Sequence, residues 1–349
     1  MAKATKQLDT FDALLADAVA AKATDLLLVA GHPPQARIDG EFKRQGKRVL
    51  AATDTEAFAR ALFDDKCLKE EVPAYGFSIT TRQAGSEGYA RVAVSRAAGA
   101  FSLNARLHGH APIPSVKECR LPAAAISLLE QPNGLVVVAG PQGSGKTTTL
   151  YSLVDWINQN RAVHICTVEK PRHYGLRPAK AIIQQREVGV DVNSYPAGIA
   201  AAMNQDLDVL MPGEIEDFET LGATLYAAET GHLVLTQLHG NSVGDALERL
   251  VEAAGETSAG TVRRQLAEAL RGVVFQRLLR SVSGKGRVAV YEVMIPDDDW
   301  RTRVRNGETL STLRGGSGSL LMREHLQELM HEKAVLPEDA KRLAADLGD

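Results

Sequence analysis

Hydrophobic positions in the second half of the chain form short, continuous runs. Gly134 to Gly140 reads GLVVVAG, and the segments VHICTVE, LDVLM and HLVLTQLH are runs of the same kind. An unbroken apolar run predicts a strand that is buried on both faces of a parallel sheet. Longer amphipathic stretches separate these runs. We therefore predict an α/β domain with a mostly parallel sheet.

The first third of the chain has shorter segments with turn residues between them. Phe11, Leu14, Leu15 and Val19 recur at helical spacing after a cap at Asp9 or Thr10, which predicts an opening helix. A second helix is expected near Thr55 to Phe63. The predicted strands are Asp25 to Ala30, Gln35 to Phe42, Tyr75 to Thr80, Tyr89 to Ser95 and Ala100 to His108. This pattern predicts a small α+β domain with an antiparallel sheet.

The segment HGHAPIPSV, with two prolines and a glycine, is the best linker candidate. We expect an N-terminal domain over residues 1–110, a linker over 111–118 and a second domain over 119–349. The end of the chain is predicted to be helical, with Leu326, Leu329 and Met330 on one face. Pro337 lies near the start of the last predicted helix and Gly348 just past its end.

Composition and charge narrow the class of protein. The 349 residues suit about two domains, and 44% are hydrophobic. Net charge is −3, from 40 basic and 43 acidic residues, so we expect no nucleic-acid partner. Cys67, Cys119 and Cys166 form no C-x-x-C pair, which argues against a zinc site or a disulfide framework. No segment has the apolar core of a signal peptide or a membrane span, so we expect a cytoplasmic protein.

The segment GPQGSGKTTTL fits the phosphate-loop pattern G-x-x-x-x-G-K-[ST]. Glycines let successive backbone N–H groups point at phosphate oxygens, and the following helix adds its positive N-terminal dipole. A predicted strand ends at Gly140 and an amphipathic helix begins inside the motif, which is the context such a loop requires. The expected nucleotide-binding residues are Gly140, Gln142, Gly143, Ser144, Gly145, Lys146, Thr147 and Thr148. We therefore predict binding of a nucleoside triphosphate.

Two acidic residues are candidates for this site because ligands collect at the carboxyl ends of parallel strands. Asp208 opens its predicted strand and Glu214 lies past the end of it. At about 3.3 Å per residue the two are up to roughly 20 Å apart, so only Glu214 is expected near the phosphates. The alternative is that Glu214 is a solvated acid in a turn. Glu169 closes the segment CTVE in the same way.

Several motifs, in this order, resemble the hexameric secretion and type IV pilus ATPases. They are ATDLLLVAGHPPQARIDG, the phosphate loop, IIQQREVG, LYAAETGHLVLTQLHGNS and LRGVVFQRLLRSVSGKGRVAVYEVM. The similarity runs from about residue 20 to about residue 330, and it is strongest to the pilus retraction motors (PilT-like). Assembly and secretion motors usually carry an extra N-terminal domain, and many carry a four-cysteine zinc loop. We expect neither feature in this protein. The resemblance implies a RecA-like P-loop ATPase domain preceded by a small PAS-like α+β domain.

The resemblance also implies roles for particular residues. Lys146 would hold the phosphates of ATP, Thr147 would ligate Mg²⁺, and Glu214 would polarise the attacking water, with Glu169 in the same site. Arg91 and Arg106 would act as charge-stabilising fingers. His232 and His239 would sense the γ-phosphate and link neighbouring subunits. The plainer alternatives are solubilising arginines and structural histidines, and a seven-residue gap is wrong for two metal ligands on one strand face.

The partners implied by the resemblance are further copies of the chain and proteins of the pilus machine. They comprise a head-to-tail homo-hexamer, an inner-membrane pilus platform protein and a paralogous motor ATPase. The chain would then lie at the inner membrane as a peripheral protein. Late in the chain, Arg301, Val304 and Arg305 match part of an arginine-rich segment that the family links to retraction.

The chain departs from the family pattern at five positions. Lys170 and His173 stand where acids are expected, Ala200 and Asn204 where arginines are frequent, and Glu216 where an arginine is usual. A lysine cannot ligate Mg²⁺, and a charge reversal is costly unless its partner has also changed. These departures leave open a second function, a weakly hydrolysing accessory or regulatory ring subunit. A P-loop kinase is a third alternative, with no recognisable lid or acceptor site to support it.

Overall fold

The computed structural model describes residues 10–38, 41–63, 77–84, 88–108, 112–284 and 286–347. Contacts between Cα atoms divide the chain into two compact units. The first comprises Met1–Pro112 with Pro171–Gly175, and the second comprises Ile113–Lys170 with Leu176–Asp349.

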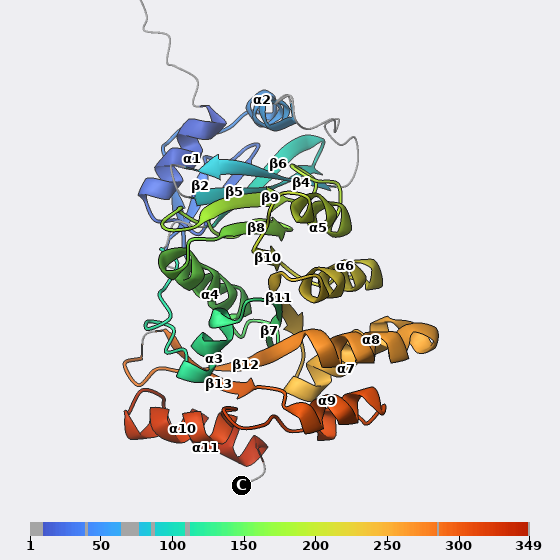
Figure 1. The fold of residues 1–349 in the computed structure, drawn as a ribbon. Helices are drawn as coiled ribbons and strands as arrows, with labels where there is room; N and C mark the ends of the chain where they lie inside the picture. The colour runs from blue at the N-terminus through green and yellow to red at the C-terminus, as the bar shows by residue number, and fades with distance from the viewer. Residues whose placement is uncertain are drawn as a thin grey trace, which may run out of the picture. The chain divides into compact units, whose positions relative to one another are not determined.

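The described strands of the first unit form an antiparallel six-stranded sheet in the order β3-β2-β1-β6-β5-β4. Two helices accompany it (Figure 1), and Thr10 caps α1 because its Oγ1 accepts a hydrogen bond from Ala13 N at 3.2 Å. The elements are α1 (Phe11–Ala20), β1 (Asp25–Val29), β2 (Gln35–Ile38), β3 (Glu41–Arg44), α2 (Ala52–Phe63), β4 (Phe77–Ala84), β5 (Gly88–Ala97) and β6 (Ala100–His108). The predicted α+β class with an antiparallel sheet is confirmed.

The prediction of one strand over Gln35 to Phe42 was wrong. Two strands, β2 and β3, pair antiparallel there, with Arg37 opposite Phe42. The sequence between them contains Asp-Gly, which is a strong hairpin signal that the strand assignment ignored. Tyr75 and Gly76, the start of the third predicted strand, lie outside the described residues.

The described strands of the second unit form a seven-stranded sheet in the order β13-β12-β7-β11-β10-β8-β9. Neighbouring strands are parallel except for β12 and β13, so the predicted mostly parallel sheet is confirmed. Strand β9 and the hairpin β12–β13 were not predicted as strands. The bounds are β7 (Gly134–Gly140), β8 (His164–Glu169), β9 (Ile182–Glu187), β10 (Val209–Pro212), β11 (Leu233–His239), β12 (Leu270–Arg280) and β13 (Arg287–Met294).

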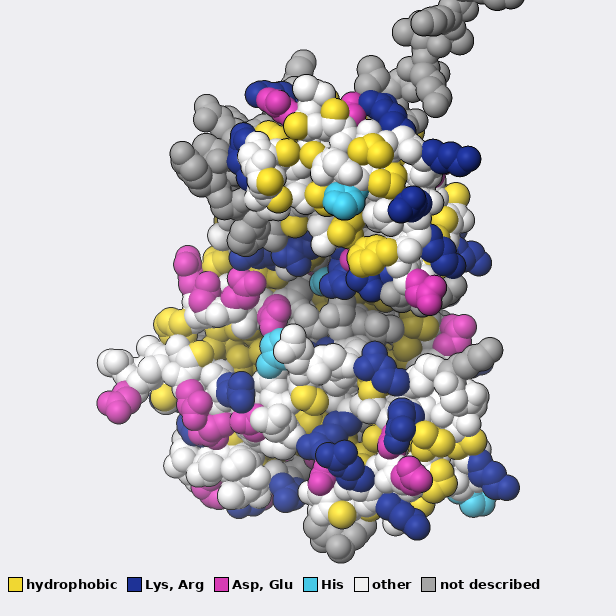
Figure 2. Space-filling view, turned by 180° about the vertical axis from the view of Figure 1, so that it is seen from behind, with side chains coloured by type: hydrophobic (Ala, Val, Ile, Leu, Met, Phe, Trp, Pro, Cys, Tyr) yellow, Lys and Arg dark blue, Asp and Glu magenta, His cyan; other side chains and the backbone are white. Residues whose placement is uncertain are grey.

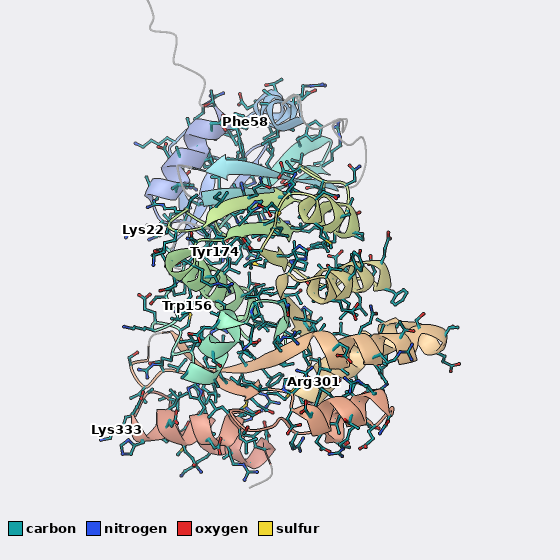
Figure 3. All side chains as sticks on the ribbon, viewed as in Figure 1. Lys22, Phe58, Trp156, Tyr174, Arg301 and Lys333 are labelled. Carbon is teal, nitrogen blue, oxygen red and sulfur yellow. The ribbon has the colours of Figure 1, made fainter. Side chains whose placement is uncertain are left out.

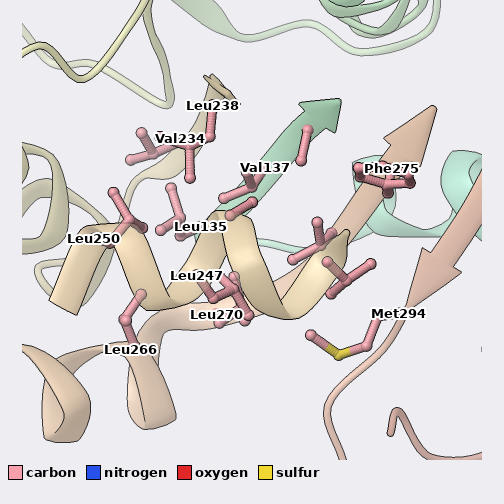
Figure 4. Close-up of a cluster of buried hydrophobic side chains, with 14 of the residues drawn as sticks. Leu135, Val137, Val234, Leu238, Leu247, Leu250, Leu266, Leu270, Phe275 and Met294 are labelled. Atoms are coloured by element: carbon pink, nitrogen blue, oxygen red, sulfur yellow. The ribbon is translucent and has the colours of Figure 1, made fainter. Parts of the chain in front are cut away.

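Helices cover both faces of this sheet (Figure 1). Leu135 and Val137 of β7 pack in the cluster that α7 and α8 cover, together with Leu247 and Leu266 (Figure 4). Val136 and Val138 alternate with them, so they face the layer that contains α4. The described helices are α3 (Ala123–Ser127), α4 (Lys146–Asn160), α5 (Tyr195–Met203), α6 (Phe218–Glu229), α7 (Val243–Ala253), α8 (Gly255–Ala269), α9 (Asp298–Arg305), α10 (Met322–His331) and α11 (Pro337–Asp346), with short 3₁₀ turns at Leu128–Glu130 and Leu310–Thr312.

The C-terminal helices follow the prediction with one exception. Pro337 is the first residue of α11, and Leu326 and Leu329 of α10 are buried. Met330 was predicted on the same face but is 42% exposed, because the buried stripe of α10 runs through His325 and Met330 lies at its edge. Gly348 lies outside the described residues.

Arg301 of α9 has a structural role in the second unit (Figure 3). Its guanidinium donates hydrogen bonds to the carbonyls of Ala267 and Leu270, which closes the C-terminus of α8. Burial lowers the pKa of Arg301. Arg301, which the sequence analysis matched to an arginine-rich family segment, therefore caps the C-terminus of α8. Basic side chains commonly bond the last carbonyls of a helix in this way.

Acidic and basic side chains are interspersed on the face of the second unit that Figure 2 shows. This mixture agrees with the small net charge of −3. Among the described helices, none combines the length and apolar character needed to cross a membrane.

Candidate phosphate-binding site

The phosphate loop joins β7 to α4. Strand β7 ends at Gly140 and α4 begins at Lys146, so the strand–loop–helix context expected from the sequence is present. Gly143 and Gly145 have φ values of +74° and +87°, in the left-handed region that favours glycine. A Cβ atom added to Gly140 would lie 2.5 Å from Gln276 O and 2.7 Å from Ser144 Oγ. The backbone therefore curls tightly, and only glycine fits at Gly140.

Lys146 is the charged centre of this loop. Its side chain is buried, and its Nζ donates to Gly140 O at 3.0 Å and to Pro141 O at 2.9 Å. Burial lowers the pKa of Lys146, while the negative charge of Glu214 opposes that shift. The lysine is therefore held inside the loop, near a carboxylate that lies far from it in the sequence.

His239 connects Lys146 to Glu214. His239 is the last residue of β11 and lies beside Gly140 in the sheet register. Its Nδ1 is 3.2 Å from Lys146 Nζ, and its Nε2 is 3.1 Å from Glu214 Oε1. Because an ammonium group only donates, Nδ1 accepts from Lys146, and Nε2 carries the proton that Glu214 accepts. The structure thus places the Glu214 carboxylate beside the loop, and its role toward the attacking water stays a prediction.

Asp208 lies at the other end of the same strand. Its Oδ2 accepts a hydrogen bond from N of His164, the first residue of β8, at 2.8 Å. Pro212 is still paired with Val168 of β8. Pairing of β10 with β11 includes only Val209 and Leu210, so the proline lies beyond the paired section on that side.

The Thr147 hydroxyl donates to Gln237 Oε1 at 3.1 Å. Among the described residues, no group of three or more His, Cys, Asp or Glu side chains could hold a metal ion. Mg²⁺ in nucleotide sites is usually held by one or two protein oxygens together with substrate phosphates. The oxygens of Thr147 and Gln237 therefore suit a site of that kind. Gln142 is exposed on the loop, and the Thr148 carbonyl accepts from Ser152 Oγ at 2.8 Å.

Glu169 is enclosed rather than open to the loop. It is 1% exposed, and its carboxylate accepts hydrogen bonds from Tyr151 of α4, from Thr167 at 2.6 Å and from Gln185 of β9 at 3.3 Å. These bonds connect α4 to β8 and β9. In this structure Glu169 therefore ties together the elements that carry the loop, and its role at the nucleotide stays a prediction.

His232 and His239 lie at opposite ends of β11. His232 N donates to Ala227 O at 3.2 Å, and its ring Nδ1 lies 3.0 Å from the same carbonyl, where α6 ends. The seven-residue offset between the histidines spans roughly 23 Å of strand. The structure brings His239 to the phosphate loop of its own chain and leaves His232 at the far edge of the sheet. A role for His232 toward a neighbouring subunit stays a prediction.

Arg91 and Arg106 lie directly opposite each other on β5 and β6 of the first unit. Such pairs share one face of a sheet, and like charges in that position destabilise it. Asp25 offsets the repulsion, because its carboxylate oxygens lie 3.3 Å from Arg106 Nε and 3.9 Å from Arg37 Nε. The sheet thus carries two exposed cations side by side. Both belong to the first unit, and the site around Lys146 consists of second-unit residues.

Comparison with known proteins decides the family. Residues 120–340 match the sequence model of a family described as Type II/IV secretion system protein. The chain belongs to this family. It is 34% identical over 303 residues to the type IV pilus retractation ATPase PilT of Pseudomonas aeruginosa, covering 84% of each protein. It is 36% identical over 235 residues to the twitching motility protein of Neisseria gonorrhoeae, covering 66% of this chain and 63% of that protein.

A solved structure of the same family has the same fold. The crystal structure of the pilus retraction motor PilT with bound ADP superimposes with a TM-score of 0.82 and 33% identity. The match covers 95% of this chain and 96% of that one. The α/β fold predicted for this type II/IV secretion system protein, with its small antiparallel domain, is therefore confirmed.

Two departures of this type II/IV secretion system protein from the family pattern form an ion pair. Lys170 Nζ lies 3.2 Å from Glu216 Oε2, and both side chains are about half exposed. The resemblance implies an acid at position 170 and an arginine at position 216, so both signs differ from that expectation and remain opposite to each other.

The other departures have local explanations or lie elsewhere. Asn204 Nδ2 donates to Ala200 O at 2.9 Å, at the C-terminus of α5, so this pair closes the helix. His173 lies in the segment Pro171–Gly175, which groups with the first unit.

Sequence reasoning missed Tyr195. This residue begins α5 and is 5% exposed. Burial, together with the charges of Glu216, Glu214 and Glu169, raises the pKa of its phenol, so Tyr195 stays neutral among three acids. An aromatic residue at the start of an apolar helix is typical of a core position, and no signal distinguished it. Gln276 was also missed, although the two polar residues Gln276 and Arg277 inside the run VVFQRLL are an available signal.

Proposed function

We propose that this protein is a Mg-ATP-hydrolysing motor that powers type IV pilus retraction. The observation that carries the proposal is the chain of hydrogen bonds from Lys146 through His239 to Glu214. It holds a carboxylate beside the phosphate loop, where a water-orienting residue is needed in phosphoryl transfer to water. The names of the relatives, a retraction ATPase and a twitching motility protein, support the same function.

Each residue of the site has a role in this proposal. The loop N–H groups and Lys146 bind the phosphates of ATP, and Thr147 holds Mg²⁺, which neutralises the charge on them. Glu214 orients the attacking water. The two ring nitrogens of His239 are both engaged, so His239 fixes the carboxylate and links its position to that of Lys146. A phosphate that draws Lys146 away frees Nδ1 of His239, and this change reports nucleotide binding to Glu214.

The mechanical part of the proposal concerns the two units and the assembly. Arg91 and Arg106, side by side on one sheet face, supply positive charge to the phosphates when the first unit closes on nucleotide. The motor is a head-to-tail homo-hexamer, and its domain movement acts on an inner-membrane pilus platform protein. A paralogous motor ATPase is a further partner. The protein works in the cytoplasm, at the inner membrane through these partners.

A second candidate function is supported by two observations. Glu169 is saturated by protein donors, and Lys170 beside it cannot ligate Mg²⁺. Both features weaken the acidic segment that follows β8. A weakly hydrolysing accessory or regulatory ring subunit would bind ATP with the same loop and turn over slowly.

Mg²⁺-dependent phosphate release by the purified protein separates the two functions. The proteins compared are wild type, Lys146→Ala, which abolishes phosphate binding, and Glu214→Gln, which retains it. A motor is expected to release phosphate at least about a hundredfold faster than Glu214→Gln. A wild-type rate equal to that of Glu214→Gln, with ATP still bound, would exclude the motor and favour the accessory subunit.

A further inference from the structure

The hairpin formed by β12 and β13 donates hydrogen bonds to two successive carbonyls of the phosphate loop. Gln276 Nε2 of β12 lies 2.5 Å from Ser144 O, and an Arg287 guanidinium nitrogen of β13 lies 3.2 Å from Gly143 O. The two strands pair antiparallel, and β12 runs beside β7, with Phe275 opposite Ala139. Gln276 follows Phe275 on β12 and therefore lies beside the end of β7, where the phosphate loop begins.

These two bonds fix the direction of two peptide groups. In a trans peptide the C=O and N–H bonds point in opposite directions. The Gly143 carbonyl shares a peptide with the N–H of Ser144, and the Ser144 carbonyl shares one with the N–H of Gly145. Holding both carbonyls toward the hairpin therefore turns both N–H groups away from it, and the N–H of Ser144 then donates to Pro141 O at 3.3 Å inside the loop. Successive N–H groups directed at one point form the anion-binding concavity of a phosphate loop.

Gln276 is packed against the loop at close range. It is 1% exposed, and a Cβ atom added to Gly145 would lie 3.2 Å from its Nε2. Among the described residues, neither Gln276 Oε1 nor Ser144 Oγ has a hydrogen-bond partner. A buried polar atom without a partner costs stability. An apolar side chain at position 276 would avoid this cost, so packing alone does not explain the glutamine.

We propose that Gln276 is a positioning residue that holds the phosphate loop in its nucleotide-binding conformation, with Arg287 as a second support. Gln276 acts through the Ser144 carbonyl and touches no substrate. The inference rests on the proposed binding of nucleotide by the loop. The hairpin then contributes to the binding of nucleotide in the ground state. Loss of this contribution should weaken the binding of ADP and of ATP equally.

The test compares Gln276→Leu with wild type and with Arg280→Gln. Leucine keeps the side-chain bulk and removes the donor. Arg280 lies on the same strand, opposite Arg287, and its guanidinium pairs with Asp339, so it controls for changes to β12 itself. Calorimetric titration with ADP and with a non-hydrolysable ATP analogue measures affinity, and steady-state kinetics separate KM from kcat.

Gln276→Leu is expected to weaken binding of both nucleotides about tenfold, the effect of one buried hydrogen bond. KM for ATP should rise by the same factor with kcat within about twofold, as for an interaction made equally in the ground and transition states. Arg280→Gln is expected to bind like wild type. Affinity of Gln276→Leu within about twofold of wild type would overturn the inference, and so would a fall in kcat with unchanged affinity.

Two further variants keep the test decisive. If Gln276→Leu does not fold, Arg287→Gln, an exposed change, is expected to weaken ADP and the ATP analogue equally by about threefold, the effect of a solvent-exposed hydrogen bond. Unchanged affinity, or a loss for the ATP analogue alone, would overturn the inference.

Lys146→Ala tests the proposed function on which the inference rests. If Lys146→Ala loses ADP binding while the hairpin variants keep it, only the inference fails. If Lys146→Ala binds ADP like wild type, the proposed function itself fails.

Discussion

Nε2 of His239 lies 3.1 Å from Oε1 of Glu214, although His239 ends β11 and Glu214 follows the end of β10. The parallel sheet brings both strand ends to one edge, where the phosphate loop also lies. On the other side of the imidazole, Nδ1 accepts from Lys146 at 3.2 Å. The imidazole therefore fixes the carboxylate relative to the lysine, and this relation underlies the first prediction.

His239→Ala is expected to reduce kcat for ATP hydrolysis by about 10- to 100-fold, because Glu214 loses the group that orients it. Affinity for ATP should change by less than about threefold, since the loop N–H groups still bind the phosphates. His164→Ala is the matched control, a histidine at the amino end of β8. Equal effects of the two substitutions on kcat would contradict the assigned role of His239.

The exchanged pair Lys170–Glu216 predicts that the two positions are coupled. Lys170→Glu and Glu216→Arg each bring like charges together, and each should lower the free energy of unfolding by about 1 kcal/mol or less, because both side chains are about half exposed. The double variant restores an opposite-charge contact and should recover most of the loss. Urea unfolding of the four proteins measures the coupling. If the losses of unfolding free energy in the two single variants simply add in the double variant, the ion pair contributes nothing to stability.

Tyr151→Phe separates the structural role of Glu169 from a catalytic one. The substitution removes one donor from a buried carboxylate, so the free energy of unfolding should fall by about 1–3 kcal/mol. Affinity for ATP is expected to stay within about threefold of the wild-type value. Unchanged stability in urea unfolding would mean that the carboxylate is not anchored to α4, and Glu169 would then be available to the site.

His325 predicts a pH dependence of stability. It is 5% exposed, and its Nδ1 accepts a hydrogen bond from Tyr291 N at 3.0 Å, so protonation of that nitrogen would break the bond. Burial lowers the pKa of His325 from 6.5, against the raising effect of Glu328 and Glu332, while Arg120 adds to the lowering. Between pH 6.5 and the lower pKa of the folded state, the unfolded chain therefore binds a proton that the folded chain does not.

Stability is thus expected to fall as the pH drops below 6.5, by at most about 1.4 kcal/mol per pH unit from this residue. His325→Gln keeps an acceptor for Tyr291 and removes the titration. Its unfolding free energy should fall less steeply than that of wild type between pH 7 and pH 5. Parallel curves for the two proteins would show that His325 titrates normally in the folded state.

The fold and the centre of the site could be predicted from the sequence because their signals are local or topological. GLVVVAG indicates a buried strand by itself, and the rule that ligands collect at strand ends distinguished Glu214 from Asp208. The same rule, applied to both ends of HLVLTQLH, would have separated His239 from His232. The two histidines were grouped because of the family resemblance, although the length of the strand between them already indicated that they lie far apart.

The remaining site residues depend on contacts that no local pattern records. Gln276 and Ser144 are 132 residues apart, and nothing near either one indicates the other. Lys170 and Glu216 each looked like an isolated defect, because the compensation is visible only when β8 and β10 lie side by side. Tyr195 looked like a core residue, and it is one. The acids whose charges raise its pKa, Glu216, Glu214 and Glu169, lie in other segments of the chain.

The most direct test of the account is single-turnover hydrolysis by Glu214→Gln at saturating Mg-ATP, with nucleotide affinity measured on the same protein. Glutamine keeps the size of the side chain and removes the negative charge that orients water. The account predicts that the rate of the chemical step falls by at least about a hundredfold while affinity for ATP stays within about threefold of wild type. A chemical step within a few-fold of the wild-type rate would contradict it, because Glu214 would then not be the carboxylate that orients the attacking water.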